Sequence, residues 1–350
     1  MRLLKRAVLL VLLAVAVLAV HADAWIRSPA TTFAVLPPGA TNPEGITVDS
    51  EGNVYVTTFA VGGTSSGVGQ IFVFSHSGKL LRQVDVAGSS TLLLDLAFHP
   101  TTGHLLVIDF GGKQVLDVNP VTGASSVFTT IPDLNGMSPP DPGPNVLTFD
   151  SVGNVYISDS FQGVIWRTGS GGGAPVAWVT NALLTTSGVP PFGANGLAFN
   201  NSQTALFVAN TGNDTVVKIP VTPGMSGPVA GTPAVFVNSV NGADGLIIDE
   251  DDNIWVAANQ ADEIVVIDPT GRVIAKLGDF GGIDPKGEPN GLLFPASLVR
   301  KGNFIYVTNL ALDMRLFGLA QPVDAQWAAQ VTRHTVAKIR ARIPPVQGLP

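Results

Sequence analysis

A pattern that recurs about every 50 residues constrains the fold of this chain more than any other feature of its sequence. Each copy opens with a polar residue, continues through a short apolar run and a turn rich in Gly, Asn and Asp, and ends in a second apolar run. The fifth copy is DGLIIDEDDNIWVAAN. The residues that open the six copies are Glu44, Asp95, Asn145, Asn195, Asp244 and Asn290. Such a period is typical of an array of identical supersecondary units.

Within each copy, apolar and polar residues alternate over short runs rich in Val, Ile, Phe and Leu, which is typical of β-strands. In the fifth copy the pattern predicts four strands separated by turns, over residues 246–248, 254–257, 263–267 and 273–277. Four antiparallel strands per copy make one propeller blade. We therefore expect an all-β fold, a six-bladed β-propeller of four-stranded antiparallel blades.

The sixth copy lacks a recognisable fourth strand after Ile339. The segment TTFAVLPP from Thr31 resembles SSVFTTIP from Ser125, which is the fourth strand of the second copy. We expect this N-terminal strand to complete the last blade and close the ring, because closure removes exposed strand edges. The sixth copy also carries an insertion at about residues 310–334. It is either a wall or lid on one face of the ring or an ordinary surface excursion.

The first 24 residues have the organisation of an export signal. Arg2, Lys5 and Arg6 precede an uncharged apolar run over residues 7–20, and Ala22–Ala24 offers a small-x-small cleavage site. A membrane-spanning helix needs about 20 apolar residues, so the run fits a cleaved signal better than the alternative, an uncleaved anchor. We expect residues 1–24 to be a signal peptide and residues 25–350 a single propeller domain. The mature protein would be periplasmic or extracellular, without a stable membrane anchor.

Composition excludes several classes of function. The formal net charge is −7, which disfavours nucleic acid as a partner because binding it depends on clustered Lys and Arg. The chain has no cysteine, so a disulfide framework, a thiolate metal site and a cysteine nucleophile are all impossible.

The residues that open the copies predict a metal site. The first strand of each blade lies nearest the propeller axis, so these side chains should converge at one mouth of the central channel. Glu44 and Asp244 would supply carboxylates, and Asn145 and Asn195 would supply amide oxygens; such an oxygen-only set suits a hard divalent cation. Two carboxylates would balance the charge of calcium, whereas zinc is disfavoured without Cys or paired His.

A simpler interpretation of the same residues remains open at this point. Asn-Gly and Asp-Gly, as found at Asn195 and Asp244, are common turn signals. Against that interpretation, Asn145 precedes Val146, and Glu44 is not a turn-forming residue, yet both occupy the same register as the other two.

The segments PEGITVD, NGLAFNNSQTALFVANT and DGLIIDEDDNIWVA resemble the senescence-marker-protein, or gluconolactonase, family of six-bladed propellers, which includes regucalcin and bacterial lactonases. The resemblance implies that Glu44, Asn145, Asn195 and Asp244 bind a catalytic divalent metal, commonly calcium. Paraoxonase-type lactonases are similar at Asn195 and Asp244.

The chain departs from this family near Asn145. Sugar-lactone hydrolases of the family have an Arg two residues before the corresponding Asn, where this chain has Gly143, and usually an Asp after it, where this chain has Val146. A polyhydroxylated substrate is therefore disfavoured. The resemblance implies metal-dependent hydrolysis of a lactone or related ester, and this departure favours a more apolar lactone or ester as the substrate.

Two carboxylates are candidates for the catalytic base that deprotonates a water molecule. Asp244 is the first by resemblance, and Asp95 is the second because it opens the second copy and is not needed as a ligand. Gly63–Gly67 matches a Gly-x-Ser-x-Gly motif, but it lies in a Gly/Ser loop and not in a strand-to-helix turn. His99 is either an acid or base at the channel mouth or a histidine in a surface turn.

Two alternatives to catalysis remain open. The first is a non-catalytic exported propeller, similar to NHL-type propellers, that binds a ligand or protein partner, because the fold itself does not determine function. The second is a metal that only stabilises the ring.

Overall fold

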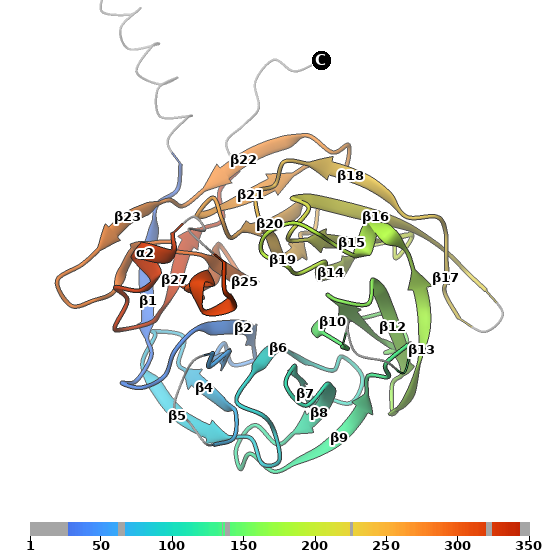
Figure 1. Ribbon diagram of the computed structural model, residues 1–350, viewed down its shortest axis with the longest axis horizontal. Helices are drawn as coiled ribbons and strands as arrows, with labels where there is room; N and C mark the ends of the chain where they lie inside the picture. Colours follow the sequence, from blue (N-terminus) through green and yellow to red (C-terminus); the bar gives the residue numbers. More distant parts are fainter. Residues whose placement is uncertain are drawn as a thin grey trace, which may run out of the picture.

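The computed structural model describes residues 27–61, 67–134, 136, 141–224, 227–319 and 324–343. Six sheets form a ring around a central channel, viewed along its axis in Figure 1. The predicted six-bladed β-propeller of antiparallel sheets is therefore confirmed. The predicted signal peptide, residues 1–24, lies outside the described residues.

The first five blades follow the order of the chain, each running from its innermost to its outermost strand. Blade 1 comprises β2 (Pro43–Val48), β3 (Val54–Thr58), β4 (Gln70–Phe74) and β5 (Leu80–Asp85), and blade 2 comprises β6 (Leu93–Phe98), β7 (Leu105–Asp109), β8 (Gln114–Val118) and β9 (Ser125–Thr130). Blade 3 comprises β10 (Pro144–Phe149), β11 (Val155–Asp159), β12 (Val164–Gly169) and β13 (Gly172–Thr180). Blade 4 comprises β14 (Ala194–Phe199), β15 (Ala205–Asn210), β16 (Thr215–Thr222) and β18 (Ala234–Asn238), with the short β17 (Val229–Ala230) paired to the end of β16. Blade 5 comprises β19 (Ala243–Ile248), β20 (Ile254–Ala258), β21 (Glu263–Ile267) and β22 (Val273–Leu277).

Blade 6 joins the two ends of the chain. It contains β25 (Pro295–Lys301), β26 (Phe304–Asn309), β27 (Thr335–Arg340) and, as its outermost strand, β1 (Ala30–Val35). Strand β1 pairs antiparallel with β27, from Ala30 opposite Ile339 to Val35 opposite Thr335. The predicted completion of the last blade by the N-terminal strand is confirmed. The innermost strands of blades 1 and 6, β2 and β25, also contact each other, so the ring is continuous.

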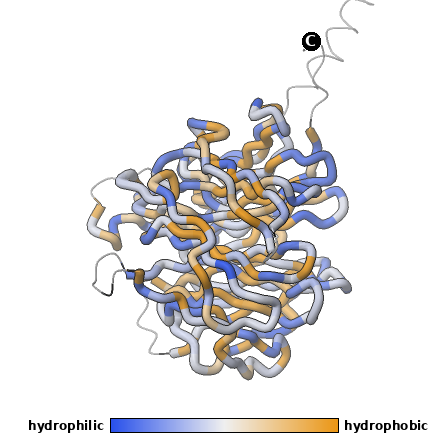
Figure 2. Tube along the Cα trace, turned by 90° about the vertical axis from the view of Figure 1, so that its right-hand side faces the viewer, coloured by the Kyte–Doolittle hydropathy of each residue, from blue (hydrophilic) through white to orange (hydrophobic). Residues whose placement is uncertain are grey.

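Apolar clusters between neighbouring blades hold the ring together. Between blades 1 and 2, for example, Tyr55 and Ile71 pack against Leu96 and Leu105, all of them buried. Each fully buried side chain of this size contributes about 1.5–3 kcal/mol. The second strands β3, β7, β11 and β20 are buried along their whole length because a blade covers each of their faces. In Figure 2 apolar segments alternate with hydrophilic ones along the chain throughout the molecule.

A few short elements lie outside the blades. Strands β23 (Phe280–Ile283) and β24 (Pro289–Gly291) form a hairpin between blades 5 and 6. The 3₁₀ helix η2 (Ala182–Leu184) precedes blade 4, and η3 (Met314–Phe317) and the helix α2 (Ala325–Ala328) lie in the insertion of blade 6. None of the helices in the described ranges has the length and apolar character needed to cross a membrane.

Each innermost strand carries a bulge at the same place. The pairing register with the second strand shifts between Pro43 and Ile46 in blade 1, and at the equivalent positions of the other five blades. A bulge bends the strand and re-aims the side chains within it. In blade 1 the bulged N–H of Gly45 donates to Thr57 Oγ1, whose hydroxyl in turn bonds the Leu94 carbonyl oxygen of blade 2. The bulges therefore also tie neighbouring blades together.

Candidate metal centre

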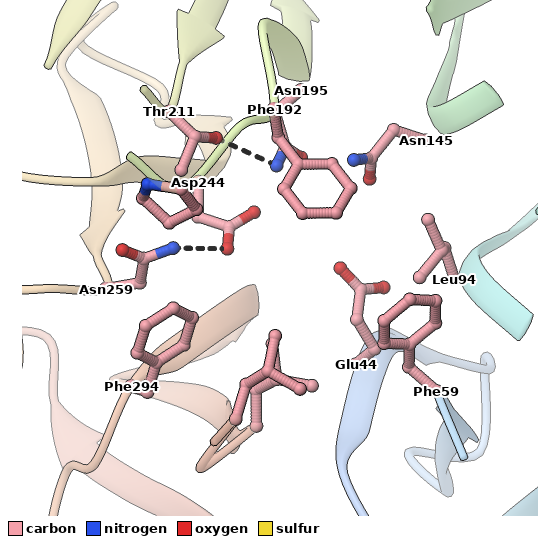
Figure 3. Close-up of a pocket in the computed structure, with 13 residues that line it drawn as sticks. Glu44, Phe59, Leu94, Asn145, Phe192, Asn195, Thr211, Asp244, Asn259 and Phe294 are labelled. Carbon is pink, nitrogen blue, oxygen red and sulfur yellow. Dashed lines mark hydrogen bonds between the residues drawn. The ribbon is translucent and has the colours of Figure 1, made fainter. Parts of the chain in front are cut away.

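The second residue of each innermost strand lies in the bulge, at one mouth of the channel. These residues are Glu44, Leu94, Asn145, Asn195, Asp244 and Ala296. Figure 3 shows Glu44, Asn145, Asn195 and Asp244 pointing toward one another from four different blades. They line a cavity of about 30 Å³, which is room for one ion or water molecule. The structure brings together the four residues that the sequence predicted as metal ligands.

Each of these four side chains presents an oxygen without a hydrogen-bond partner among the described residues. The four atoms are Glu44 Oε2, Asn145 Oδ1, Asn195 Oδ1 and Asp244 Oδ1, and all are buried. Leaving a buried polar atom unsatisfied costs about 1–3 kcal/mol. Four such oxygens around one cavity are ligands of the kind that a hard cation prefers.

The other polar side-chain atoms of Asn145, Asn195 and Asp244 are fixed by hydrogen bonds. The amide nitrogen of Asn145 donates to Ser160 Oγ, and that of Asn195 donates to Thr211 Oγ1, each at 3.0 Å. These bonds turn both amide oxygens toward the centre. Asp244 Oδ2 accepts from Asn259 Nδ2 at 3.0 Å, which leaves Oδ1 free (Figure 3).

Burial and mutual repulsion raise the pKa values of the two carboxyl groups. Desolvation raises the pKa of Glu44 well above its ordinary value, and the charges of Asp244 and Asp95 add to the effect. Desolvation also raises the pKa of Asp244 to about 7. Neither group takes part in the ion pairs found among the described residues. A cation would relieve this repulsion, so the residues fit a divalent metal.

The candidate set uses only two carboxylates. In the part of the chain that the structure describes, no three His, Asp or Glu side chains are grouped as a metal site would require. Binding of a cation here must therefore depend on the amide oxygens of Asn145 and Asn195, which favours a hard cation over zinc.

The structure corrects the register of the second copy. Leu93 pairs with Asp109 as Pro43 pairs with Thr58, so Leu94, and not Asp95, is the counterpart of Glu44. Asp95 is one residue further along β6. It lines the wider channel behind the mouth, about 470 Å³ in volume, and its Oδ2 accepts from the Leu147 N–H at 3.0 Å. Burial raises its pKa to about 7.

The register of the sixth copy is also corrected. Asn290 lies in the hairpin strand β24 and is exposed, whereas Ala296 of β25 occupies the position at the mouth. The sequence pattern placed the polar residue too early because the hairpin β23–β24 precedes the true first strand.

The Asn-Gly and Asp-Gly pairs lie within strands and not in turns. A Cβ on Gly196 would lie 2.4 Å from the Asp244 carbonyl oxygen, and one on Gly245 would lie 2.7 Å from the Ala296 carbonyl oxygen. Glycine at these positions lets neighbouring innermost strands approach each other. The interpretation of these pairs as turn signals is therefore wrong.

Two other candidate residues lie elsewhere. His99 is buried in the turn after β6, where its Nε2 bonds the Gly153 carbonyl oxygen at 2.9 Å. It is thus a structural residue between blades 2 and 3. The motif Gly63–Gly67 falls outside the described residues except for Gly67, which is exposed.

A second ring of residues, which the sequence pattern did not predict, directly follows the second strand of each blade. They are Phe59, Phe110, Ser160, Thr211, Asn259 and Leu310. The polar members are the partners that orient the metal-ligand candidates. Their constant position after the second strand of each copy was a signal that could have found them.

Two family models match parts of the chain. Residues 145–278 match the model described as the SMP-30/Gluconolactonase/LRE-like region, and residues 38–57 match a β-propeller repeat. None of the curated proteins is similar enough in sequence to match.

Several solved structures share the fold at low sequence identity. The calcium-binding protein regucalcin from Agrobacterium tumefaciens is 15% identical with a TM-score of 0.59, over 92% of this chain and 99% of its own. A gluconolactonase from Xanthomonas campestris is 12% identical with a TM-score of 0.57, over 90% and 98%. A catalytically inactive virginiamycin B lyase from Staphylococcus aureus, solved with quinupristin, is 16% identical with a TM-score of 0.52, over 80% and 81%. The resemblance of this chain to the SMP-30, or gluconolactonase, family of propellers is thus confirmed.

Proposed function

We propose that the protein is an exported, metal-dependent hydrolase that opens a lactone or a related ester at the mouth of its central channel. The observation that supports this most strongly is the convergence of four buried, unpartnered oxygens from four blades. Calcium is the expected metal because the set combines two carboxylates with two amide oxygens. Export is proposed from the sequence of residues 1–24 alone.

In this proposal Glu44, Asn145, Asn195 and Asp244 hold the cation. Bound there, the cation would polarise the substrate carbonyl and stabilise the negative charge that develops on its oxygen. Ser160 and Thr211 keep the two amide oxygens directed inward through the hydrogen bonds described above. Asn259 has the same role for Asp244.

Asp244 accepts the proton of the attacking water on its carboxylate group, which lines the same cavity. The water oxygen bonds to the carbonyl carbon, the acyl C–O bond breaks, and the leaving alkoxide oxygen takes up the proton that Asp244 received from the water. The product of a lactone is the hydroxy acid. Asp95 remains the second candidate for the base, but it lines the channel behind the mouth, so we assign the proton transfer to Asp244.

Thermal unfolding tests the metal site. The unfolding midpoint should be lowest in chelator and rise when calcium is added back, with smaller effects of magnesium and zinc and about one calcium per chain by elemental analysis. Glu44→Gln should abolish the calcium-dependent rise, whereas Glu51→Gln, at an exposed position, should keep it. If calcium is not bound and causes no shift, the hydrolase mechanism fails and a partner-binding propeller is the better explanation.

A panel of lactones and esters tests the activity. Asp244→Asn should lower kcat/KM by about 100-fold or more. The exposed neighbour Asp251→Asn provides the matched control and should leave kcat/KM unchanged. Calcium binding without turnover of any lactone or ester would mean that the metal only stabilises the ring.

A further inference from the structure

Phenylalanine rings from five blades or their connecting loops form a series of contacts that begins at the cavity of the four oxygens. The rings form a continuous series with centroid separations of 5.7 Å for Phe59–Phe110, 5.8 Å for Phe110–Phe161, 5.6 Å for Phe161–Phe192 and 6.4 Å for Phe192–Phe317. We call these five residues the aromatic rim. Phe59 and Phe192 line the same cavity as the four oxygens (Figure 3).

The outer part of the aromatic rim is accessible to solvent. Phe59 is buried, Phe110, Phe161 and Phe192 are half-buried, and Phe317 is 38% exposed beside Leu316, which is 55% exposed. Contiguous apolar groups around a polar cavity are typical of a ligand-binding site. The cavity among the oxygens, about 30 Å³, is too small for a whole substrate, so the body of the ligand must lie against the rim.

The backbone next to Asn145 is shaped to accept one of these rings. A Cβ on Gly143 would lie 2.7 Å from Cδ2 of Phe161, so the ring packs directly on the strand entry. No polar side chain can project toward the mouth from this position. The aromatic rim is therefore continuous above the ligand set.

The mouth also has an apolar side. In blades 3, 4 and 5 the residue after the second strand is polar and orients a ligand candidate, whereas in blades 6, 1 and 2 it is Leu310, Phe59 or Phe110. Leu94 and Leu312 add to this side. None of the described residues that line the cavity is Lys or Arg. The polar side chains that line the cavity are thus the four ligand candidates together with Thr211 and Asn259 beside them.

We propose that the site takes lactones or esters whose substituent is an alkyl chain or an aryl group, held against the aromatic rim while the carbonyl lies at the oxygens. Phe161, Phe192 and Phe317 are then specificity-determining residues. This inference rests on the proposed hydrolase function for its substrate type, but the preference for an apolar group is tested separately.

The probes are γ-lactones with n-alkyl chains of increasing length, from γ-butyrolactone to γ-dodecalactone, compared with a polyhydroxylated lactone. Each methylene that contacts the rim should raise kcat/KM by about 2- to 4-fold. Phe192→Ala should reduce this dependence on chain length, mainly through KM, and leave the calcium-dependent rise in unfolding midpoint intact. Phe317→Ser, at a more exposed position, should have the same effect with less risk to folding.

Phe236→Ala is the matched control. Phe236 is a half-buried ring on the outermost strand of blade 4, where it packs against Phe207 at 5.0 Å. This variant should keep the full dependence on chain length.

Calorimetric binding of the corresponding 4-hydroxy acids separates the two proposals. Affinity that rises with chain length and falls in Phe192→Ala supports the apolar site even if no lactone is hydrolysed. Calcium-dependent hydrolysis without dependence on chain length, or with preference for the polyhydroxylated lactone, overturns the inference and leaves the hydrolase intact.

Discussion

At the scale of single residues, the site is defined by two buried acids that no basic side chain neutralises. Glu44 and Asp244 are both 4% exposed, and each raises the cost of ionising the other. Buried like charges are destabilising unless they are protonated or bind a cation. The stability of the protein should therefore depend on both pH and calcium.

The direction of the pH effect follows from the raised pKa values. A folded-state pKa of about 7 for Asp244, above the ordinary value of about 3.9, means that the folded protein holds an extra proton between these pH values. In chelator, the stabilisation that this extra proton provides is complete below about pH 4 and is lost as the pH rises through 7. Over this range the free energy of unfolding should fall by up to about 1.4 kcal/mol per pH unit.

Thermal unfolding between pH 5 and 8 measures this effect. The unfolding midpoint in chelator should fall with increasing pH, and the calcium-dependent rise should grow over the same interval because the cation needs ionised carboxylates. Asp244→Asn should flatten both trends. A midpoint in chelator that does not change from pH 5 to 8 would contradict the proposed burial of the acid pair.

The residues that orient the ligand set should matter almost as much as the ligands. Thr211→Val preserves shape but removes the acceptor that holds the Asn195 amide, so calcium affinity should fall by about 10-fold or more. Thr129→Val is a suitable control, because it removes a buried hydroxyl that donates to Gly173 at 2.7 Å, far from the mouth. Calcium titration followed by calorimetry compares the two. Equal affinity in both variants would show that Thr211 does not position the ligand.

At the scale of elements, the bulged innermost strand creates the site. The bulge places one side chain per blade at the mouth. It also brings the innermost strand close to that of the next blade, and Gly196 and Gly245 leave the space for this approach. The four ligand candidates could be predicted from the sequence because, in four of the copies, the polar residue that opens the repeat is also the residue in the bulge. The other two predicted positions were wrong. Asp95 lies one residue beyond the bulge position of β6, and Asn290 lies in the extra hairpin, yet both fit the sequence spacing.

Gly196→Ala tests the close approach of the innermost strands. The added Cβ would lie 2.4 Å from the Asp244 carbonyl oxygen and 2.6 Å from the Leu246 nitrogen, so β19 must shift. The free energy of unfolding should fall by about 1–3 kcal/mol, and calcium affinity should fall with it. Gly169→Ala, where a Cβ meets no atom within 4 Å, should change neither. Denaturant unfolding and calcium titration of both variants provide the measurement, and a stable Gly196→Ala variant with normal affinity would contradict this account.

At the scale of the whole molecule, the ring depends on a pairing between the two ends of the chain. The pattern predicted this closure because the last copy lacked one strand and the N-terminus supplied a matching one. The aromatic rim could not be predicted in the same way. Phe59 and Phe110 follow the repeat, but Phe161, Phe192 and Phe317 do not occupy such a repeated position, and the contacts among these three rings exist only in the folded ring.

Closure can be tested within strand β1 by comparing its two faces. Ala34 is 3% exposed and packs in a cluster with Phe72 and Tyr306, whereas Thr32 on the same strand is exposed. Ala34→Asp buries an unpaired charge and should lower the free energy of unfolding by about 2–5 kcal/mol, while Thr32→Asp should change it by less than about 0.5 kcal/mol.

Loss of β1 from the sheet would also expose the edge of β27, and open strand edges promote association between chains. Ala34→Asp should therefore form oligomers in size-exclusion chromatography near its unfolding transition, at temperatures where Thr32→Asp stays monodisperse. Equal stability and equal elution of the two variants would mean that blade 6 does not need β1. The contact between β2 and β25 would then be enough to close the ring. The mouth of the channel, to which β2 and β25 both contribute, would keep its shape without β1.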